Sequence, residues 1–374
     1  LHRPIAPSPS PSPGTFSEAT LERGRHVFAL GNCASCHTVD GGRANAGGRA
    51  VETPFGTVYS TNITPDPETG LGRWSFEAFE RAMRHGISRD GHNLYPAFPY
   101  TSFARMDADD MLSLYAYVQT LTPVRQDTPN ARIMAPANLR PALSLWNALY
   151  QDKDPFVPVA GESDLWNRGK YLVEAAGHCS ACHAPRNLAG AEKPEMLGAM
   201  IKGWYAPPLE GPEAAARGWT AETLFAYLRE GHSELAAASG PMAEVVSSLT
   251  ALPDNDIRAI ATYLASLSPS GHQNSGKNAT MREIAPSRAS RIYESACAVC
   301  HEPALAGTFT AALVPLERSA VLRAPLPDAL ETLLLEGLRA PANLKLRDMP
   351  SFRNELAESD RAALASYLRL RFAP

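Results

Sequence analysis

Three copies of the sequence Cys-x-x-Cys-His constrain this chain more than any other feature. They occupy residues 33–37, 179–183 and 297–301, and together they contain all six cysteines of the protein. Cys-x-x-Cys-His is the attachment sequence of c-type haem. Two cysteines three residues apart lie about one helical turn apart, so both thiols can form thioethers to one porphyrin while the next histidine reaches the iron. The sequence therefore predicts three covalent haems c, attached through Cys33, Cys36, Cys179, Cys182, Cys297 and Cys300.

Three other uses of paired cysteines fit the pattern less well. A thiol-redox Cys-x-x-Cys motif needs a βαβ context and no adjacent histidine. Structural zinc needs four nitrogen or sulfur ligands, usually from two clusters close in sequence, and these copies lie far apart. Disulfides would pair six cysteines without a demand for histidine. We favour haem attachment over these alternatives.

The length of the chain and the repeated motif predict three haem domains in an all-α fold. A chain of 374 residues is expected to form two to three domains, and three motifs favour three. Each segment of about a hundred residues is small for a self-sufficient apolar core, and a buried haem supplies part of that interior. No strand pattern of any length is visible. The predicted boundaries are a leader at 1–15, haem domains at 16–122, 161–268 and 285–374, a connector at 123–160 and a linker at 269–284.

Each predicted domain repeats one order of elements: helix, haem motif, loop, helix, methionine loop, helix. The helices follow from apolar residues at helical spacing and from capping residues. They are predicted at 16–30, 75–85 and 111–121 in the first domain, at 165–176, after Thr220 and at 256–267 in the second, and at 287–296, 330–338 and 359–370 in the third.

Two proline-rich segments flank the first domain. The leader has proline at positions 4, 7, 9, 11 and 13 and is predicted to be extended, either as a stalk or as a disordered end. In the connector, prolines are expected to break any long element. An apolar patch in the connector is expected to pack onto neighbouring haem domains rather than onto a partner protein, and it consists of Leu143, Leu145, Trp146, Leu149 and Tyr150.

Charge and hydropathy limit the partners and the cellular locations that fit the sequence. A net charge of −4 and a pI near 6.2 provide no basic field for nucleic acid. No run of roughly 18 or more apolar residues is present to span a membrane. Covalent haem is assembled outside the bacterial cytoplasm, so we expect a periplasmic location at the outer face of the cytoplasmic membrane. The sequence begins at Leu1, so we expect a processed or trimmed chain that has lost a signal peptide or an N-terminal anchor.

The histidines of the three motifs, His37, His183 and His301, are the predicted proximal iron ligands. The other ring nitrogen of each should donate to a backbone carbonyl, which fixes the tautomer. A methionine thioether on the opposite face raises the potential and closes the iron to substrates, as electron transfer requires. Met242 and Met349 are the predicted sixth ligands, because each lies beside a proline ahead of the closing helix of its domain.

The first domain departs from this pattern. Phe98 stands where the other domains have methionine, and its ring has no donor atom. Either another side chain binds the iron, or the iron is five-coordinate. We expect the two histidines among the candidates to lie on the surface. The candidates are Met83, His85, His92 and Met106.

Met83 is the predicted sixth ligand of the first haem. It stands nine residues after Trp74, and Leu228 of the second domain stands nine residues after Trp219. This register should lie over the haem in both domains. The alternative is that Met83 is a core residue beside a five-coordinate iron.

Longer stretches of the sequence resemble one family. They are Thr61–Asp66 with Thr69–Gly70, Leu94–Tyr100, Gly240–Val246 and Met349–Phe352, and they are spread over all three predicted domains. They resemble the tri-haem cytochrome c subunits of membrane-associated periplasmic dehydrogenases in acetic acid bacteria and relatives. The resemblance implies three tandem domains like class I cytochromes c, each wrapped around one covalent haem, and a dehydrogenase as partner.

Phe98 helps to distinguish the class of dehydrogenase that the resemblance implies as partner. The cytochromes of quinoprotein alcohol dehydrogenases and of flavin-dependent sugar or gluconate dehydrogenases usually have methionine there. With Phe98, the start Arg3–Pro7 and the end Tyr367–Phe372, the chain is more similar to the cytochromes paired with molybdopterin aldehyde, isoquinoline and nicotinate dehydrogenases. This resemblance implies a large molybdopterin subunit and a small 2Fe–2S subunit as partners.

The sequence thus predicts an electron-transfer subunit rather than an enzyme in its own right. It is expected to take single electrons from the partner's iron–sulfur centre and pass them through three haems to membrane ubiquinone or a terminal oxidase. Three alternatives stay open. They are a subunit of a quinoprotein alcohol or flavin-dependent sugar dehydrogenase, a haem peroxidase or reductase acting at an open first haem, and a free multi-haem shuttle.

Overall fold

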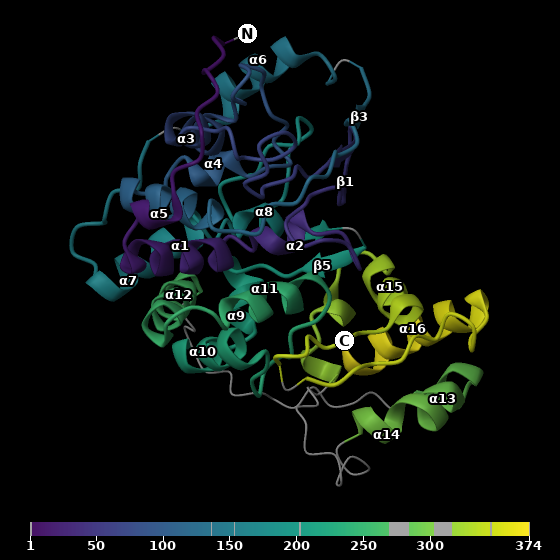
Figure 1. Ribbon diagram of the computed structural model, residues 1–374. Coiled ribbons are helices and arrows are strands. Elements are labelled where there is room, and N and C mark those ends of the chain that lie inside the picture. Colours follow the sequence, from purple (N-terminus) through teal and green to yellow (C-terminus); the bar gives the residue numbers. More distant parts are fainter. Residues whose placement is uncertain are drawn as a thin grey trace. The chain divides into compact units, whose positions relative to one another are not determined.

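Helices dominate the computed structural model, which describes residues 2–135, 137–152, 154–201, 203–268, 284–302, 316–344 and 346–373 (Figure 1). The chain gathers into two compact units. Unit 1 contains Leu1–Ala181, Arg186–Glu192 and Ala251–Pro253, and unit 2 contains Cys182–Pro185, Lys193–Thr250 and Asp254–Pro374.

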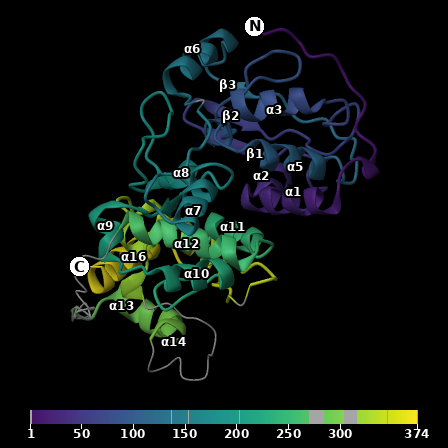
Figure 2. The same ribbon diagram turned by 90° about the vertical axis from the view of Figure 1, so that its left-hand side faces the viewer.

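Two crossing helices form the base of unit 1. They are α1 (Glu18–Leu30) and α5 (Ala108–Val118), which lie side by side in both ribbon views (Figure 2). Ser17 caps α1, because its hydroxyl accepts a hydrogen bond from a backbone amide of the first turn. A Cβ atom at Gly24 would lie 2.0 Å from the carbonyl oxygen of Ser113, so the close crossing requires glycine. The predicted helices at 16–30 and 111–121 are confirmed, with shifted ends.

Helix α3 (Phe76–His85) places the predicted Met83 register inside unit 1. Ser75 caps it, and Gly86 ends it at a left-handed φ of 60°, as the sequence predicts. Met83 is buried on the inner face of this helix. A shorter helix, α4 (Tyr100–Phe103), follows the loop that contains Phe98.

The mostly helical fold is confirmed, but the described residues also contain two small antiparallel sheets that the sequence does not predict. Each strand has at most four residues, too few for an alternating pattern to stand out in the sequence. A Cβ atom at Gly56 would lie 2.1 Å from the carbonyl oxygen of Arg132, so glycine permits the pairing of two of the strands. The strands are β1 (Ala50–Thr53), β2 (Gly56–Tyr59) and β3 (Arg132–Ile133) in one sheet, and β4 (Ala199–Ile201) and β5 (Trp204–Ala206) in the other.

The connector also differs from its prediction. It forms an eleven-residue helix, α6 (Arg140–Tyr150), where prolines were expected to exclude long elements. Pro141 lies in the first turn, where a helix needs no amide donor and tolerates proline. The position of a proline within a helix, rather than its presence, decides whether the helix is broken.

Helix α6 divides the predicted apolar patch between two faces. Leu143 and Asn147 are buried, and the Asn147 side chain accepts a hydrogen bond of 2.7 Å from the hydroxyl of Tyr100. Leu145 and Leu149 lie on the other face, and each is 65% exposed. The patch therefore packs onto unit 1 along one side only.

The leader is extended, as predicted, and it is hydrogen-bonded along unit 1 over residues 2–8. It is therefore neither a free stalk nor a disordered end in this stretch. A short 3₁₀ turn, Pro13–Thr15, precedes α1. The bonds from leader amides to unit 1 carbonyls are His2 to Gly91 at 3.1 Å, Ile5 to Arg89 at 2.8 Å and Ser8 to Arg73 at 3.1 Å.

Another helix of unit 1, α7 (Asp164–Glu174), precedes the second haem motif. Its cap is Ser163, whose hydroxyl accepts a hydrogen bond from the amide of Trp166. The prediction of a helix at 165–176 is confirmed within two residues at each end.

Unit 2 contains four helices between the second and third motifs in the described residues. They are α9 (Gly211–Ala216), α10 (Ala221–Glu230), α11 (Pro241–Leu249) and α12 (Asp254–Leu267). Thr220 begins α10 in a capping box, as the sequence indicates. Helix α11 was not predicted, because its first residues were assigned to a turn.

Further helical elements of unit 2 surround the third motif in the described part of the chain. They include α13 (Arg288–Ile292), continued by a π-helical turn at Tyr293–Cys297, then α15 (Asp328–Glu336) and α16 (Glu358–Phe372). The predicted linker 269–284 lies outside the described residues except for its last residue. The core that these elements share includes Tyr293, Leu330, Leu334, Leu364 and Phe372.

Candidate haem-attachment sites

Each of the three Cys-x-x-Cys-His motifs ends in a short helix. These helices are α2 (Cys33–His37), α8 (Ser180–His183) and α14 (Ala298–His301). A helical turn brings side chains three residues apart onto one face. Helix α2 contains both cysteines of the first motif, as the spacing predicts, whereas the first cysteine of the second and third motifs directly precedes its short helix.

The residue before the first cysteine is strained in two of the motifs. Asn32 and His178 adopt left-handed backbone conformations, with φ of 46° and 38°. The hydroxyl of Ser35 donates to the side-chain oxygen of Asn32 at 2.7 Å, which supports the first of these turns. In the third motif the chain enters through the π-helical turn instead. The first two motifs thus share an entry that the third lacks.

The motif histidines of the first two sites are held as iron ligands require. Nδ1 of His37 lies 2.6 Å from the carbonyl oxygen of Thr61, and Nδ1 of His183 lies 2.6 Å from that of Pro207. Burial lowers the pKa of both imidazoles, against the opposing effect of these hydrogen bonds. A neutral ring that donates from Nδ1 leaves the Nε2 lone pair available to a metal.

The third site differs in this respect. Nδ1 of His301 is buried and has no hydrogen-bond partner among the described residues. Burial lowers its pKa as well. Residues 303–315, which follow the motif, lie outside the described part of the chain. The expected carbonyl partner is therefore confirmed for two of the three histidines.

The cysteines fit haem attachment better than thiol redox chemistry or disulfides. None of the six is in a disulfide, and in each motif the first cysteine is half-buried and the second exposed. Burial raises the pKa of Cys33 to about 12 and that of Cys297 to about 11. Redox-active Cys-x-x-Cys motifs need a lowered thiol pKa, which is the opposite effect.

Structural zinc also finds no support in the described residues. They contain no group of three or more histidine, cysteine, aspartate or glutamate side chains that could hold a metal ion. Each motif instead offers one half-buried imidazole and two thiols, the donor set that covalent haem uses.

The loops that carry Phe98 and Met242 have matching backbone geometry. In each loop a backbone amide donates a hydrogen bond to the carbonyl of the glycine that ends the preceding helix. Phe98 and Met242 each stand four residues after that amide. This supports the prediction that Phe98 occupies the methionine position. The two bonds are Leu94 N to Gly86 O at 2.6 Å and Ala238 N to Gly231 O at 2.7 Å.

The two methionines predicted as sixth ligands are both half-buried. Met242 lies in the first turn of α11 and packs against a core that includes Val246. Met349 packs against the core around the third motif, and its backbone pairs with Leu338 in two hydrogen bonds of 2.8 and 3.0 Å. Their roles as ligands stay predictions.

The four candidates in the first site separate by burial. Met83 and Met106 are buried, whereas His85 and His92 are partly exposed. His92 is engaged elsewhere, because its Nδ1 lies 2.5 Å from a carboxylate oxygen of Asp90. The geometry keeps Met83 and Met106 as thioether candidates, and ligation by Met83 stays a prediction.

Phe98 belongs to an aromatic cluster rather than to a polar pocket. Its ring lies 5.5 Å from that of Phe103 and 6.3 Å from that of Tyr100, between centroids. Tyr100 is fully buried. These side chains supply apolar surface to the site, and Phe98 has no atom that could bind iron.

Known protein families match the chain over the segments that contain the motifs. The family model for cytochrome c matches residues 21–122. The model for cytochrome c oxidase, cbb3-type, subunit III matches residues 164–264 and 285–368. Each matched segment contains one Cys-x-x-Cys-His motif.

Several characterised proteins are similar over most of the chain. A nicotinate dehydrogenase subunit of Pseudomonas putida is 48% identical over 375 residues, which cover 99% of this chain and 32% of that protein. The fructose dehydrogenase cytochrome subunit of Gluconobacter japonicus is 38% identical, over 78% of this chain and 66% of that one. The alcohol dehydrogenase (quinone) cytochrome c subunit of Gluconacetobacter polyoxogenes is 35% identical, over 94% and 80%.

The chain belongs to the family of cytochrome c electron-transfer subunits of dehydrogenases.

Membership of this family establishes covalent haem c as the cofactor of the cytochrome. The cytochrome spans about a third of the length of the nicotinate dehydrogenase subunit and about two thirds of the fructose dehydrogenase subunit. The carbonyls of Thr61 and Pro207 are functional groups that sequence reasoning did not name. Each stands 24 residues after its histidine, and this equal spacing was a usable signal.

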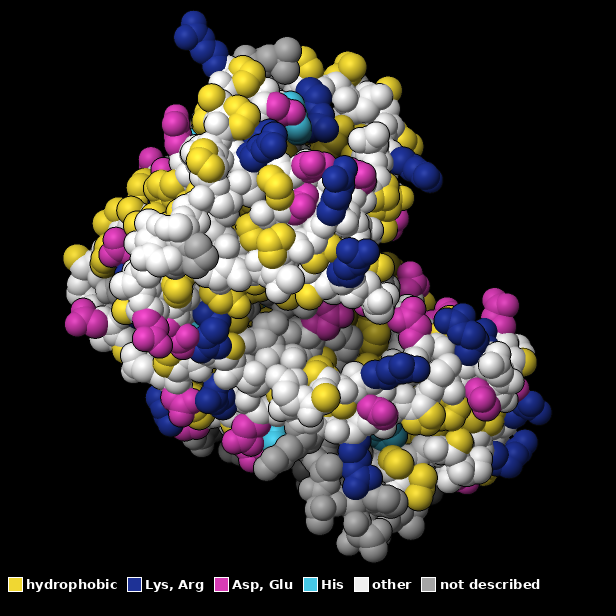
Figure 3. Space-filling view, viewed as in Figure 1, with side chains coloured by type: hydrophobic (Ala, Val, Ile, Leu, Met, Phe, Trp, Pro, Cys, Tyr) yellow, Lys and Arg dark blue, Asp and Glu magenta, His cyan; other side chains and the backbone are white. Residues whose placement is uncertain are grey.

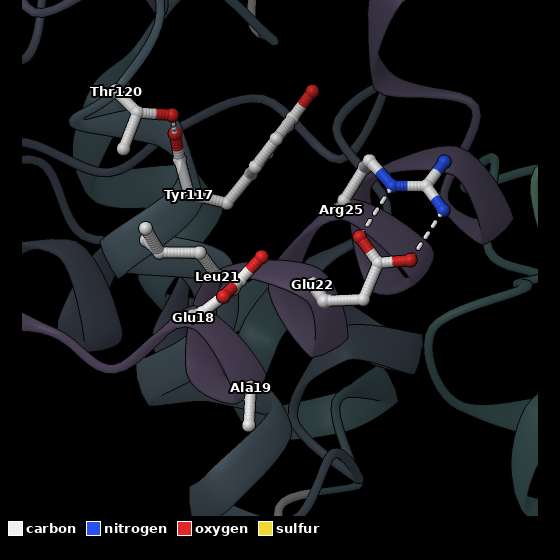
Figure 4. A pocket seen from close by; sticks show the side chains of 7 residues that line it. All are labelled: Glu18, Ala19, Leu21, Glu22, Arg25, Tyr117 and Thr120. Carbon is white, nitrogen blue, oxygen red and sulfur yellow. Dashed lines mark hydrogen bonds and ion pairs between the residues drawn. The ribbon is translucent and has the colours of Figure 1, made fainter.

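The surface of the cytochrome shows no second site of comparable chemistry among the described residues. An open depression of about 550 Å³ on α1 and α5 is lined by seven side chains, and Arg25 binds Glu22 there in a two-pronged pair of 2.6 and 2.8 Å (Figure 4). Its lining contains neither cysteine nor histidine. Basic and acidic side chains are interspersed over the face in Figure 3. None of the described helices has the length and apolar character needed to cross a membrane.

Proposed function

We propose that this cytochrome carries three haems c in three tandem domains and conducts electrons away from a dehydrogenase. The observation that carries the proposal is the threefold recurrence of a Cys-x-x-Cys-His motif that ends in a short helix and has a half-buried imidazole. The matched family segments support domains at 16–122, 161–268 and 285–374.

The residues of the chain hold and shield the cofactors in this proposal. The six cysteines form thioethers, and His37, His183 and His301 bind iron through Nε2. When bound, haem c supplies a one-electron couple between ferric and ferrous iron. Met242 and Met349, with Met83 in the first domain, complete the coordination, raise the potential and exclude substrates. Phe98 and its aromatic neighbours keep water from the first site.

The proposed electron donor is a molybdopterin dehydrogenase with a small 2Fe–2S subunit. Support comes from Phe98 in the methionine position and from the likeness to a nicotinate dehydrogenase subunit. The proposed location is the periplasm, at the outer face of the cytoplasmic membrane, because haem c is attached there. The proposed acceptor is ubiquinone or a terminal oxidase of the respiratory chain, and nucleic acid is not a partner.

Metal analysis of the untagged complex from native membranes tests the donor. Molybdenum, with iron in excess of three haems per cytochrome, supports a molybdopterin and iron–sulfur partner. A flavin or quinone cofactor without molybdenum would reject that partner. Alkaline pyridine spectra and the mass of the intact chain give the haem count independently, and a mass increase of fewer than three haems would reject the three-haem proposal.

A second partner class has specific support from the relatives. The fructose and quinone-dependent alcohol dehydrogenase cytochrome subunits are similar over 78% and 94% of this chain. Under this alternative, electrons reach the cytochrome from a flavin or quinone cofactor. The metal analysis above separates the two classes.

An enzyme acting at an open first haem is the alternative from another class, and Phe98 is the observation that favours it. A phenyl ring cannot bind iron, so an open coordination position results unless Met83 or Met106 fills it. Immediate binding of carbon monoxide by one ferrous haem would support this alternative. Six-coordinate low-spin spectra from all haems would reject it.

A further inference from the structure

A buried network joins the helix before the second haem motif to the two helices around the first. The carboxylate of Asp110, on α5, is 2% exposed. One of its oxygens accepts a hydrogen bond of 2.5 Å from Nε of Arg23 on α1, and the other accepts one of 2.6 Å from the hydroxyl of Tyr171 on α7. All three residues belong to unit 1.

Tyr171 is fixed in this network from both sides of its hydroxyl. The hydroxyl donates to Asp110 and accepts a hydrogen bond of 3.1 Å from the amide of Asp107. Burial and the nearby Asp110 charge raise the pKa of Tyr171, so the hydroxyl keeps the proton it donates. Its ring stacks edge-on against Phe156 at 5.4 Å. A buried hydrogen bond to a charged group is among the stronger polar contacts in proteins.

A second, more exposed contact supports the same docking. A guanidinium nitrogen of Arg105, which follows α4, lies 3.1 Å from a carboxylate oxygen of Glu174 at the end of α7. The carbonyl oxygen of Arg105 also accepts a hydrogen bond of 3.1 Å from the amide of Phe156. Helix α7 is therefore tied to the first haem region near its C-terminal end, and the segment ahead of the helix is tied to the same region through Phe156.

The consequence of this docking is that two attachment segments meet. A Cβ atom at Gly177 would lie 3.3 Å from the side chain of Leu30, and one at Gly31 would lie 3.5 Å from the carbonyl oxygen of Ala176. Gly31 and Gly177 each stand two residues before the first cysteine of their motif. A side chain at Gly177 would press against Leu30, and one at Gly31 would touch Ala176 at ordinary contact distance, so the two segments lie within side-chain contact of each other.

Side chains continue the contact toward the methionine position of the first site. The ring of His178, directly before Cys179, lies 5.4 Å from that of Phe103, which lies 5.5 Å from that of Phe98. Backbone bonds tie this turn to α7, including the amide of Cys179 to the carbonyl of Val173 at 3.2 Å. The turn that bears Cys179 therefore moves with the helix that Tyr171 holds.

We propose that Tyr171 is a positioning residue that fixes the turn bearing Cys179 against the first haem attachment segment, so that the haem attached through Cys179 exchanges electrons directly with the first haem. The inference rests on the proposed function, because it requires haem at both motifs. In the exchange, one ferrous iron is oxidised to ferric as the neighbouring ferric iron is reduced to ferrous. No proton is transferred, and no bond is formed or broken.

The test compares two tyrosines with the same chemistry in the haem-loaded, full-length cytochrome. Tyr171→Phe removes the hydroxyl that binds Asp110 and keeps the ring. Tyr293→Phe is the matched control, because the hydroxyl of this fully buried tyrosine also binds a carboxylate, Glu302, at 2.9 Å in unit 2. EPR relaxation of the ferric haems reports their magnetic interaction, and amide hydrogen exchange reports the stability of α7.

We expect Tyr171→Phe to retain every covalent haem, to weaken the magnetic interaction, and to lower exchange protection in residues 164–178 by about tenfold. Tyr293→Phe should leave the interaction unchanged. An unchanged interaction in Tyr171→Phe, or an equal loss in Tyr293→Phe, overturns the inference. If Tyr171→Phe yields no haem protein, Arg105→Gln carries the same test with a smaller expected change. Wild-type protein with haem missing from either motif would instead reject the proposed function.

Discussion

The regions around the first and third haem motifs each contain a cluster of a tyrosine, an arginine and a carboxylate that joins helical segments, but the two clusters join different segments. In unit 1, a tyrosine and an arginine meet a carboxylate on α5, Asp110, which is 2% exposed. In unit 2, Tyr293 and Arg371 meet Glu302, the residue directly after the third motif, at 2.9 and 2.8 Å. Glu302 is 18% exposed.

The difference lies in what each carboxylate joins. Asp110 joins the two helices of its own region to a third helix, α7, which leads to another haem motif. Glu302 joins the π-helical turn before its own motif to α16. Burial also differs, and an ion pair deeper in the protein loses more when one partner is removed. The same polar cluster thus docks a neighbouring segment in one region and closes a single region in the other.

Removal of the two carboxylates is expected to show the largest contrast. Asp110→Ala leaves the buried hydroxyl of Tyr171 without its acceptor and weakens Arg23, so we expect a loss of about 3 kcal/mol in the free energy of unfolding. Glu302→Ala should cost about 1–2 kcal/mol, because the carboxylate of Glu302 is more exposed to water than that of Asp110. Urea unfolding followed by haem absorbance measures both. Equal losses would contradict the contrast in burial.

The tight crossing of α1 and α5 offers the next test. Gly24→Ala places a methyl group 2.0 Å from the Ser113 carbonyl oxygen, so the helices must move apart, with an expected loss of about 1–3 kcal/mol. Gly14→Ala is the control, since its Cβ would meet nothing within 4 Å. Thermal unfolding compares them. Similar melting temperatures for the two variants would show that the crossing is not close-packed.

Replacement of the methionines tests whether the first and third haem irons each have a thioether ligand. Met349→Leu and Met83→Leu keep the side-chain volume and should each cost less than about 1.5 kcal/mol in stability. Each should also convert one haem from low-spin to high-spin, because leucine has no donor atom. Met134→Leu, at a 61% exposed position, is the control. An unchanged spectrum for Met83→Leu would leave Met106 or an open iron in the first site while the third keeps its thioether.

The smallest effect is expected from exposed ion pairs in acid. The hydrogen bond from Arg25 lowers the pKa of Glu22 to about 2 from a usual value of 4.5, and Arg288 lowers that of Asp360. A lowered folded-state pKa stabilises the protein above the unfolded pKa, and this contribution is lost as the pH falls through the folded pKa. Glu22→Gln should therefore flatten the decline of the urea midpoint between pH 4.5 and 2. Wild-type steepness in Glu22→Gln would reject this assignment.

Local signals account for the parts of the fold that were predicted correctly. Ser75 and Gly86 bracket α3, and Thr220 begins α10, because caps and left-handed glycines act within a few residues. The sequence does not predict the strands, because a segment of two to four residues becomes a strand only by pairing with another strand. The sequence does not predict helix α6, because proline usually breaks a helix, although the first turn tolerates Pro141.

The site divides in the same way between local and distant signals. The cysteines and motif histidines follow from a five-residue pattern. The carbonyls that hold two of the imidazoles come from the backbone of Thr61 and Pro207, and a backbone group leaves no side-chain signature. The bond between Asp110 and Tyr171 joins residues 61 positions apart, and nothing in either neighbourhood indicates the other.

Helix α6 has a practical consequence for handling the purified cytochrome. Its outer face presents Leu145 and Leu149, and Leu139 just before the helix is 58% exposed. Leucines arranged in this way on a protein with a net charge of only −4 favour self-association at high concentration. We expect the light-scattering second virial coefficient to fall as salt is added. Glutamate at both helix positions should restore it without a shift in the haem absorbance bands.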